Sequence, residues 1–207
     1  MKNIKKFLLG CMVAAGIAHT ASAQISLYLS PVSQTIGVDG LASYNLVVKG
    51  LKGSADYNGP ALGGFDVQLD YNSAIASAQS VTFGSMLNLS QDDMQISDLS
   101  APGVIYLSET SFDSPAALES AQTSSFTLAT ITLEGLTPGT TLLSFDSTYA
   151  PSLTNEDGFT LDLAGGAVGS SLAVIPEPSC TAGLTAALAL GFCALRRKFS
   201  KKSDGQA

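Results

Sequence analysis

Short stretches in which apolar and polar residues alternate recur through the middle of the chain. The clearest places Phe65, Val67 and Leu69 two positions apart, with polar residues between them. This period of two is typical of a β-strand with one face in a core and the other in water. The pattern predicts strands at Ile25–Leu29, Ser43–Val48, Gly64–Tyr71, Ser80–Phe83, Val104–Ser108, Phe126–Leu133, Thr140–Phe145, Phe159–Leu163 and Ala167–Val174.

Turn-forming pairs such as Asp39-Gly40, Pro138-Gly139 and Asp157-Gly158 separate these stretches. About nine short strands in about 150 residues predict an all-β fold, a two-sheet jelly-roll sandwich. Outside the two ends of the chain, no stretch predicts an amphipathic helix, and segments such as Asn72–Ala78 or Pro115–Ala121 leave room for a short helical turn.

The first 23 residues have the three parts of a secretory signal peptide. Met1–Lys6 contains three lysines, Phe7–Ala18 is mostly apolar, and small residues occupy Ala21 and Ala23. This order predicts cleavage between Ala23 and Gln24, and therefore export of the chain from Gln24 onward. Two alternatives stay open: an uncleaved N-terminal anchor, and lipidation of Cys11 in a sequence that superficially matches a lipoprotein box.

The other end of the chain has a second membrane-directed pattern. Pro176-Glu177-Pro178 precedes an uncharged apolar run over residues 179–195, and Arg196, Arg197 and Lys198 come directly after that run. Such a run is just long enough to predict a single transmembrane helix. Flanking cations stay on the cytoplasmic side, so the domain upstream is expected outside.

These C-terminal residues resemble the PEP-CTERM sorting signal of Gram-negative bacteria, in which a Pro-Glu-Pro motif, a transmembrane helix and a basic end succeed one another. The resemblance implies that an exosortase recognises Pro176, Glu177 and Pro178 and processes the tail. It also implies a transient inner-membrane anchor ending in Arg196, Arg197 and Lys198, then a place on the cell surface or in an exopolysaccharide or biofilm matrix. The alternative is a plain anchor with a stiff proline spacer. The predicted organisation is a signal peptide (1–23), a β-sandwich (24–174) and a sorting tail (175–207).

Charge separates the ends of the chain from the middle. Residues 24–175 contain fifteen acidic side chains and only two basic ones, Lys49 and Lys52, for a net charge of −13. A domain this acidic repels nucleic acid, whose binding requires phosphate neutralisation. Solubility outside the cell is the simplest interpretation of the negative charge. Cation binding is the more specific alternative.

The middle domain contains no Cys, His or Arg. This composition excludes the common nucleophile–base pairs and zinc sites built on imidazole or thiolate, so we expect a non-enzymatic domain. Calcium is the only cofactor to consider, because oxygen ligands are abundant at Gln91-Asp92-Asp93 and Asn155-Glu156-Asp157-Gly158. Neither segment has the ligand spacing of an EF-hand loop, and a solvated loop and a hairpin turn are the favoured interpretations. No metal ligands are assigned.

Aromatic side chains are the usual platforms of a sugar-binding face. The candidates are Tyr28, Tyr44, Tyr57, Tyr106 and Tyr149. Tyrosine on a strand usually lies partly in the core. Tyr57, within the Gly-, Asp- and Asn-containing segment 53–59, is the best single candidate for a ligand contact.

The order of motifs in the middle resembles cohesin-like domains. The carrying residues are Leu62–Asn72, then Leu128–Leu133 with Gly139-Thr140-Thr141, then Asn155–Gly158 and Ala167–Val174. The resemblance implies a jelly-roll sandwich related to some carbohydrate-binding modules, and cohesins bind dockerins in cellulosomes. The sequence leaves three hypotheses: a structural or adhesive matrix protein, a carbohydrate-binding module, and a cohesin-type protein-binding module.

Overall fold

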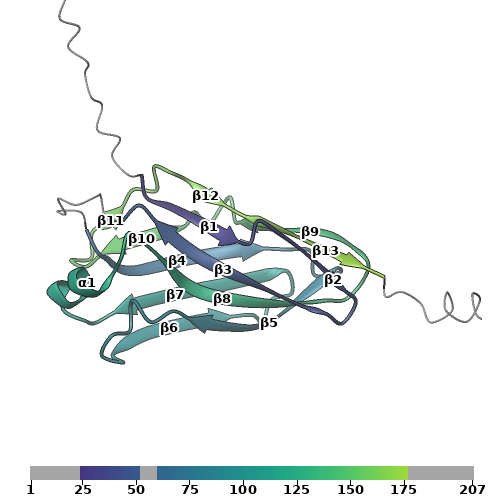
Figure 1. The fold of residues 1–207 in the computed structure, drawn as a ribbon, viewed down its shortest axis with the longest axis horizontal. Coiled ribbons are helices and arrows are strands. Elements are labelled where there is room, and N and C mark those ends of the chain that lie inside the picture. Colours follow the sequence, from purple (N-terminus) through teal and green to yellow (C-terminus); the bar gives the residue numbers. More distant parts are fainter. Residues whose placement is uncertain (1–23, 52–59, 177–207) are drawn as a thin grey trace, which may run out of the picture.

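A computed structural model of the chain describes residues 24–51 and 60–176, which form two β-sheets packed face to face and one short helix (Figure 1). The strands are β1 (Ser26–Ser30), β2 (Ser33–Gly37), β3 (Leu41–Lys49), β4 (Leu62–Asp70), β5 (Ala76–Phe83), β6 (Asp93–Asp98), β7 (Val104–Ser111), β8 (Ser125–Gly135), β9 (Gly139–Phe145), β10 (Ser152–Asn155), β11 (Thr160–Leu161), β12 (Ala167–Val168) and β13 (Ser170–Ile175), and the helix is α1 (Pro115–Ala121).

One sheet has five strands in the order β12-β1-β3-β8-β5, with the long antiparallel pair β3 and β8 at its centre. The other has eight strands. Six have the order β11-β10-β4-β9-β13-β2, while β7 pairs with the opposite side of β4, and β6 pairs with β7. Strand β4 is therefore surrounded by neighbours, whereas β6 forms an edge of the eight-stranded sheet.

The core lies between the two sheets and is built from the alternating positions of their strands. Phe65, Val67 and Leu69 of β4 are buried, as the pattern predicts. They pack in one cluster with residues of the five-stranded sheet such as Tyr44 and Ile131. The Tyr44 hydroxyl donates a hydrogen bond of 2.8 Å to the main-chain oxygen of Ser171, and so joins β3 to β13 across the sandwich.

The all-β sandwich prediction is confirmed, and so is the helical turn at Pro115–Ala121, where Ser114 caps α1. Each predicted strand is present, although Ala167–Val174 is divided at Gly169 into β12 and β13, and Phe159–Leu163 shortens to β11. At Asn72–Ala78 the structure has a single hydrogen-bonded turn and no helix. The backbone N–H groups of Ile75 and Ala76 both donate to the Asn72 carbonyl oxygen, and β5 begins at Ala76.

Three strands were not predicted: β2, β6 and β10. Strand β6 lies at a sheet edge and exposes nearly all of its residues, so it lacks the burial that alternation reports. Strand β2 is short and mostly polar, and β10 has only four residues.

The predicted signal peptide and sorting tail lie at and beyond the limits of the described residues. Gln24 is exposed and is the first described residue, and Pro176 is exposed and is the last. Ala21, Ala23, Glu177, Pro178, Arg196, Arg197, Lys198 and the predicted helix over 179–195 lie outside the described residues. Among the residues described, no helix is both long and apolar enough to span a membrane.

Candidate functional site

The outer face of β4 carries the polar half of its alternating pattern. Asp66, Gln68 and Asp70 point away from the core because their neighbours in sequence fill it. Strand β7 lies alongside in antiparallel register, which places Tyr106 opposite Gln68. The flat outer surface of a central strand thus presents two carboxylates, one amide and one phenol in a small area.

Two tyrosines converge on a single carboxylate of this surface. The Tyr106 hydroxyl donates to Asp66 Oδ2 at 2.8 Å, and the Tyr149 hydroxyl donates to Asp66 Oδ1 at 2.9 Å. The two rings meet edge to face, with centroids 5.9 Å apart. The hydrogen bond from the Tyr149 hydroxyl to the Asp66 carboxylate raises the pKa of Tyr149 to about 12, and the hydrogen bond with Tyr106 acts in the same direction.

A third carboxylate, Asp146, comes directly after β9 and holds the turn that delivers Tyr149. Its Oδ1 atom accepts hydrogen bonds from the backbone and hydroxyl of Thr148, both at 2.6 Å, and from the Tyr149 backbone. These bonds, that of the Thr148 hydroxyl first, lower the pKa of Asp146 to about 2. The Gln68 amide donates to Asp146 at 3.3 Å. Burial raises the pKa of Asp70, and the adjacent Asp146 carboxyl raises it further.

We call this set the acidic–tyrosine patch: Asp66, Gln68, Asp70, Tyr106, Asp146 and Tyr149. Its three carboxylates have no nearby counter-charge in the described chain, because Lys49 is the only basic residue in 24–51 and 60–176 and lies on the other sheet. The patch can therefore accept Lys or Arg side chains of a partner as charge-assisted hydrogen bonds. Within the same residue ranges, no three His, Cys, Asp or Glu side chains gather as a metal-binding group.

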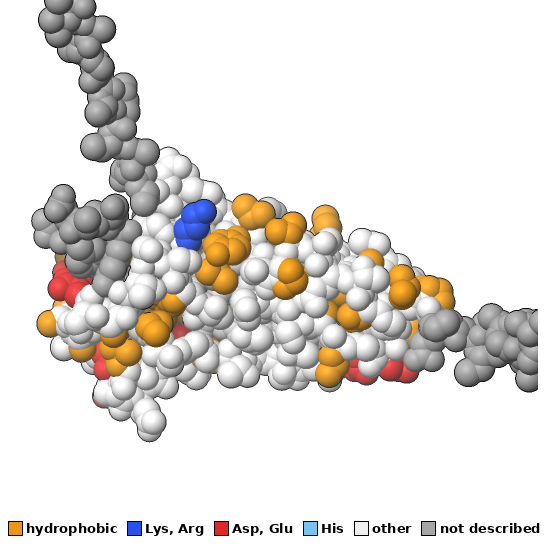
Figure 2. Space-filling model, viewed as in Figure 1, with side chains coloured by type: hydrophobic (Ala, Val, Ile, Leu, Met, Phe, Trp, Pro, Cys, Tyr) orange, Lys and Arg blue, Asp and Glu red, His pale blue; other side chains and the backbone are white. Residues whose placement is uncertain are grey.

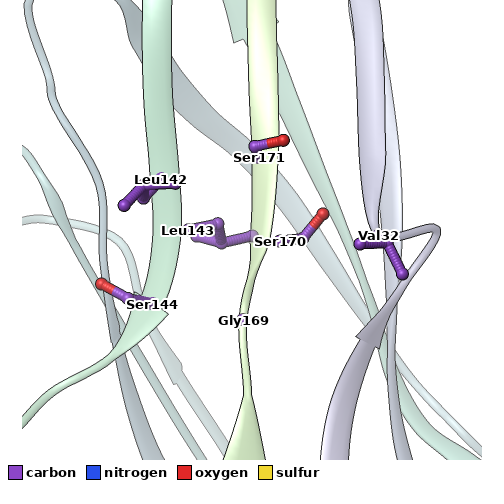
Figure 3. Close-up of a pocket in the computed structure, with 7 residues that line it drawn as sticks. All are labelled: Val32, Leu142, Leu143, Ser144, Gly169, Ser170 and Ser171. Atoms are coloured by element: carbon purple, nitrogen blue, oxygen red, sulfur yellow. The ribbon is translucent and has the colours of Figure 1, made fainter.

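An apolar groove lies over β9, β13 and the residue before β2 of the same sheet (Figure 3). Its volume is about 370 Å³. Ser144, at one end of the groove, lies directly opposite Asp70 in the β4–β9 register. Leu142 and Val32 stand at the rim with 66% and 73% of their surfaces exposed. The groove is lined by Val32, Leu142, Leu143, Ser144, Gly169, Ser170 and Ser171.

Gly169 keeps the groove open. A Cβ atom at this position would lie 2.3 Å from the main-chain oxygen of Leu143, so no larger residue fits there without displacing β9 or β13. Ser170 is fixed by a hydrogen bond of 2.7 Å from its hydroxyl to the main-chain oxygen of Pro31. Packing at Gly169 and the hydrogen bond of Ser170 thus fix the shape of the groove on the β9–β13–β2 surface.

The outer face of the five-stranded sheet differs in chemistry. It presents hydroxyl and amide side chains, such as Thr130, which donates to Asn45 at 2.8 Å. Figure 2 shows a face with scattered orange hydrophobic side chains and with red acidic side chains only toward its two ends. Lys49 lies on β3, the middle strand of this sheet.

The structure divides the predicted aromatic candidates. Tyr106 and Tyr149 come together in the patch, and Tyr149 is 41% exposed. Tyr44 is fully buried and serves the core, and Tyr28 is partly buried on β1 of the other sheet. Tyr57, the single best candidate from the sequence, lies outside the described residues.

The sequence pattern placed Asp66, Gln68 and Asp70 on the solvent-facing side of a strand but did not assign them to a site. The alternation of apolar and polar residues along β4 was the available signal. No alternation marks Asp146 and Tyr149, because a loop far along the chain brings them to β4. The Tyr149–Asp66 bond joins residues 83 positions apart.

Comparison with known proteins identifies the architecture. No family model and no curated protein matches the chain. Solved structures do match it. The sixth cohesin of Acetivibrio cellulolyticus scaffoldin B, solved with a Cel5 dockerin mutant, is 9% identical with a TM-score of 0.55, over 73% of this chain and 99% of that one. The chain has a cohesin-like fold.

Two further structures support this assignment. A type I cohesin–dockerin complex of Clostridium thermocellum containing Coh-OlpA matches at 14% identity and a TM-score of 0.55, over 73% of this chain and 99% of that one. The cohesin module of a Clostridium perfringens family 33 glycoside hydrolase matches at 15% identity and a TM-score of 0.54, over 75% and 99%. At these identities the likeness shows the fold.

Proposed function

We propose that this chain is an exported, non-enzymatic protein-binding module whose interface is the outer face of the eight-stranded sheet. One observation carries the proposal: three carboxylates without a nearby counter-charge in the described chain lie beside an open apolar groove on a single sheet face. The cohesin-like fold supports it, because two of the similar structures were solved as complexes with dockerin partners.

The surface favours a partner segment with basic and apolar side chains side by side. Lys or Arg of the partner would bond to Asp66 and Asp70, and an apolar side chain would enter the groove beside Leu142. Protein interfaces combine such an apolar anchor with a polar rim, and complementary charge speeds association and sets register. The exposed ring of Tyr149 adds the type of residue most often found at binding hot spots.

Binding to the host's secreted proteins tests the proposal. The full exported chain is immobilised, retained proteins are identified, and each purified partner is titrated against three variants. We expect Leu142→Lys and Asp70→Asn each to weaken binding about tenfold or more, as one lost interface anchor would. Leu41→Lys is the matched control, because Leu41 is 63% exposed on the opposite face. Retention that all three variants leave unchanged, or no retained protein, would refute the proposed interface.

Carbohydrate binding is the second candidate, and the exposed Tyr149 ring beside Asp66 and Gln68 favours it. Aromatic faces flanked by hydrogen-bonding groups suit sugar rings. A glycan array separates the two candidates. Binding to a polysaccharide that Tyr149→Ala abolishes, with no protein retained, would replace the protein-binding proposal with this one.

The two ends of the chain give the proposed location. We propose that the signal peptide exports the domain and is cut before Gln24. The tail would hold the domain outside the inner membrane until an exosortase processes it at Pro176, Glu177 and Pro178. The processed protein would then be released into the matrix. Mass spectrometry of the extracellular protein tests both steps, and an intact chain ending at Ala207 in that fraction would refute processing of the tail.

A further inference from the structure

Strand β7 directs a carboxyl group into the sandwich near its end. The strand buries Ile105 and Leu107, and the next residue on the same side is Glu109, which is only 1% exposed. Its neighbour in the register with β4 is Phe65, a core residue. A buried carboxylate normally requires a cation or several hydrogen-bond donors. The one donor that reaches Glu109 in the described residues is the Gln95 side-chain amide of β6, which donates to Oε1 at 2.9 Å.

A second carboxyl group lies beside Glu109. Gln95 is directly opposite Glu109 in the antiparallel β6–β7 register, and Asp93 comes two residues before Gln95. Residues two apart on a strand face the same side, so Asp93 is the diagonal neighbour of Glu109 on the core side of the pair. The two carboxyl groups lie within hydrogen-bonding reach of each other. An ionised carboxylate only accepts, so these groups bond to each other only when one of them carries a proton.

One oxygen atom of Asp93 points to the same proton. Its Oδ2 atom is shielded from water and receives no hydrogen bond from the described residues. Unsatisfied buried acceptors are rare in native proteins. A proton on Glu109 would provide a donor beside Asp93 and would remove the repulsion between two like charges. Burial raises the pKa of Glu109 to about 7, and the Asp93 carboxyl acts in the same direction, against the lowering effect of the Gln95 hydrogen bond.

The other charged groups around β7 do not compensate the buried carboxyl. Asp113, after the end of β7, keeps its charge, because the hydrogen bond from the Ser90 hydroxyl lowers its pKa. Lys49, the only basic residue in 24–51 and 60–176, lies on the opposite sheet, whose inner face is apolar. The alternate positions of the neighbouring strands, which face the outer side of the sheet, hold Asp66 and Asp70 on β4 and Asp98 on β6.

We propose that a proton shared by Glu109 and Asp93 holds β6 on the sandwich, and that loss of this proton to solvent as pH rises toward neutrality releases this edge strand. Among the described strands, β6 pairs with β7 alone, and nearly all of its residues are exposed. Two ionised carboxylates would repel each other strongly where water is excluded, and outward movement of β6 would hydrate both. Elements with few buried contacts open at the lowest free energy.

The direction of the pH response follows from where the proton is bound more tightly. The folded chain holds the Glu109 proton more tightly than the unfolded chain, in which the carboxyl has its ordinary pKa of 4.5. The stabilisation is therefore complete below this value and is lost as pH rises through a folded-state pKa of about 7. The edge is expected to be closed in acidic surroundings and loosened at neutral and alkaline pH.

Carboxyl-carbon NMR and amide hydrogen exchange of the full exported chain test the proposal. Glu109 should titrate with a midpoint near 7. Asp93→Asn should move this midpoint to lower pH, because the asparagine amide can donate to ionised Glu109. Protection factors, corrected for intrinsic exchange, of the amides that pair β6 with β7 should fall at least about tenfold between about pH 5 and pH 8. Those of the central β3–β8 pair should fall less.

Glu109→Gln is the decisive variant. Glutamine stays uncharged, can donate to Asp93 and can accept from Gln95, so this variant should fold and keep β6 protected at about pH 8. Glu156→Gln is the matched control and should retain the wild-type response. Glu156 also has a shielded oxygen without a hydrogen bond in the described chain, but it lies between β10 and β11.

The titration of wild-type Glu109 does not depend on any variant. A midpoint below about 6 would overturn the proposal, because the carboxyl would then be ionised in the closed strand at neutral pH. Constant β6 protection in the wild-type chain between about pH 5 and pH 8 would also overturn it. The same holds for a loss of protection that is equal in folded Glu109→Gln, or for a response that Glu156→Gln removes.

Discussion

Gln122, the residue after α1, holds together three separated parts of the chain. It is 3% exposed. Its side-chain oxygen accepts the Leu62 backbone N–H at 2.7 Å, and its amide donates to the Leu62 carbonyl at 2.7 Å and the Met86 carbonyl at 3.1 Å. One side chain thus completes the backbone bonding at the start of β4 and in the loop after β5. Replacing it with leucine removes all three bonds while keeping most of the volume.

The expected cost depends on the groups left behind. Both polar groups of the Leu62 backbone would lose this partner inside the protein, and each such loss costs about 1 to 3 kcal/mol. We expect Gln122→Leu to lower the free energy of unfolding by about 3 kcal/mol, because leucine recovers some apolar contact. For a domain of about 150 residues, this corresponds to a decrease in Tm of about 6 to 12 °C.

Urea unfolding monitored by circular dichroism measures this change as a shift in midpoint at constant slope. Gln79→Leu is the control. Gln79 is exposed on β5 and donates to Glu134 at 2.7 Å, so its loss should change stability by less than about 0.5 kcal/mol. A decrease below about 1 kcal/mol for Gln122→Leu would show that water replaces the lost bonds, and the reasoning from burial would be wrong.

Two further predictions concern the sheet face that carries the proposed interface. Gly169→Ala should lower the free energy of unfolding by about 2 kcal/mol, because its Cβ would lie 2.3 Å from the Leu143 main-chain oxygen. Gly37→Ala is the control, because its Cβ would have no atom within 4 Å. It should change the free energy of unfolding by less than about 0.5 kcal/mol in the same urea assay. Asp66→Asn should lower the pKa of Tyr149 from about 12 toward the ordinary 10.0, since the accepting charge is lost. Ultraviolet difference titration against a Tyr149→Phe variant measures it, and an unchanged pKa would contradict the assigned cause.

Local alternation was enough to predict the sandwich, because a strand with one buried face has apolar residues at every second position of its sequence. Strand β4 is the best case, with Val67 and Leu69 fully buried between outward polar residues. The same logic fails at an edge. Met94 and Ile96 of β6 are 48% and 42% exposed, so the apolar positions there do not report a core, and pairing with β7 alone makes the segment a strand.

The candidate sites depended on topology that no local pattern contains. The outward direction of Asp66 could be read from the sequence, but the arrival of Tyr149 depends on how the loop after β9 crosses β4. Glu109 is a sharper case. Its alternating position on β7 predicts a buried side chain, yet its charge predicts an exposed one, and the burial prevails. Such a conflict between pattern and chemistry often marks a functional position.

The placement of the proposed interface bears on how a tethered domain would work. The chain leaves the sandwich through β13, at the end opposite α1 (Figure 1). Strand β6 begins and β7 ends at the α1 end, because Asp93 pairs with Ser111. A domain held by its C-terminal segment would therefore direct α1 away from the attachment point. The acidic–tyrosine patch and the apolar groove lie on the outer face of the eight-stranded sheet, so a partner could approach that face from the side.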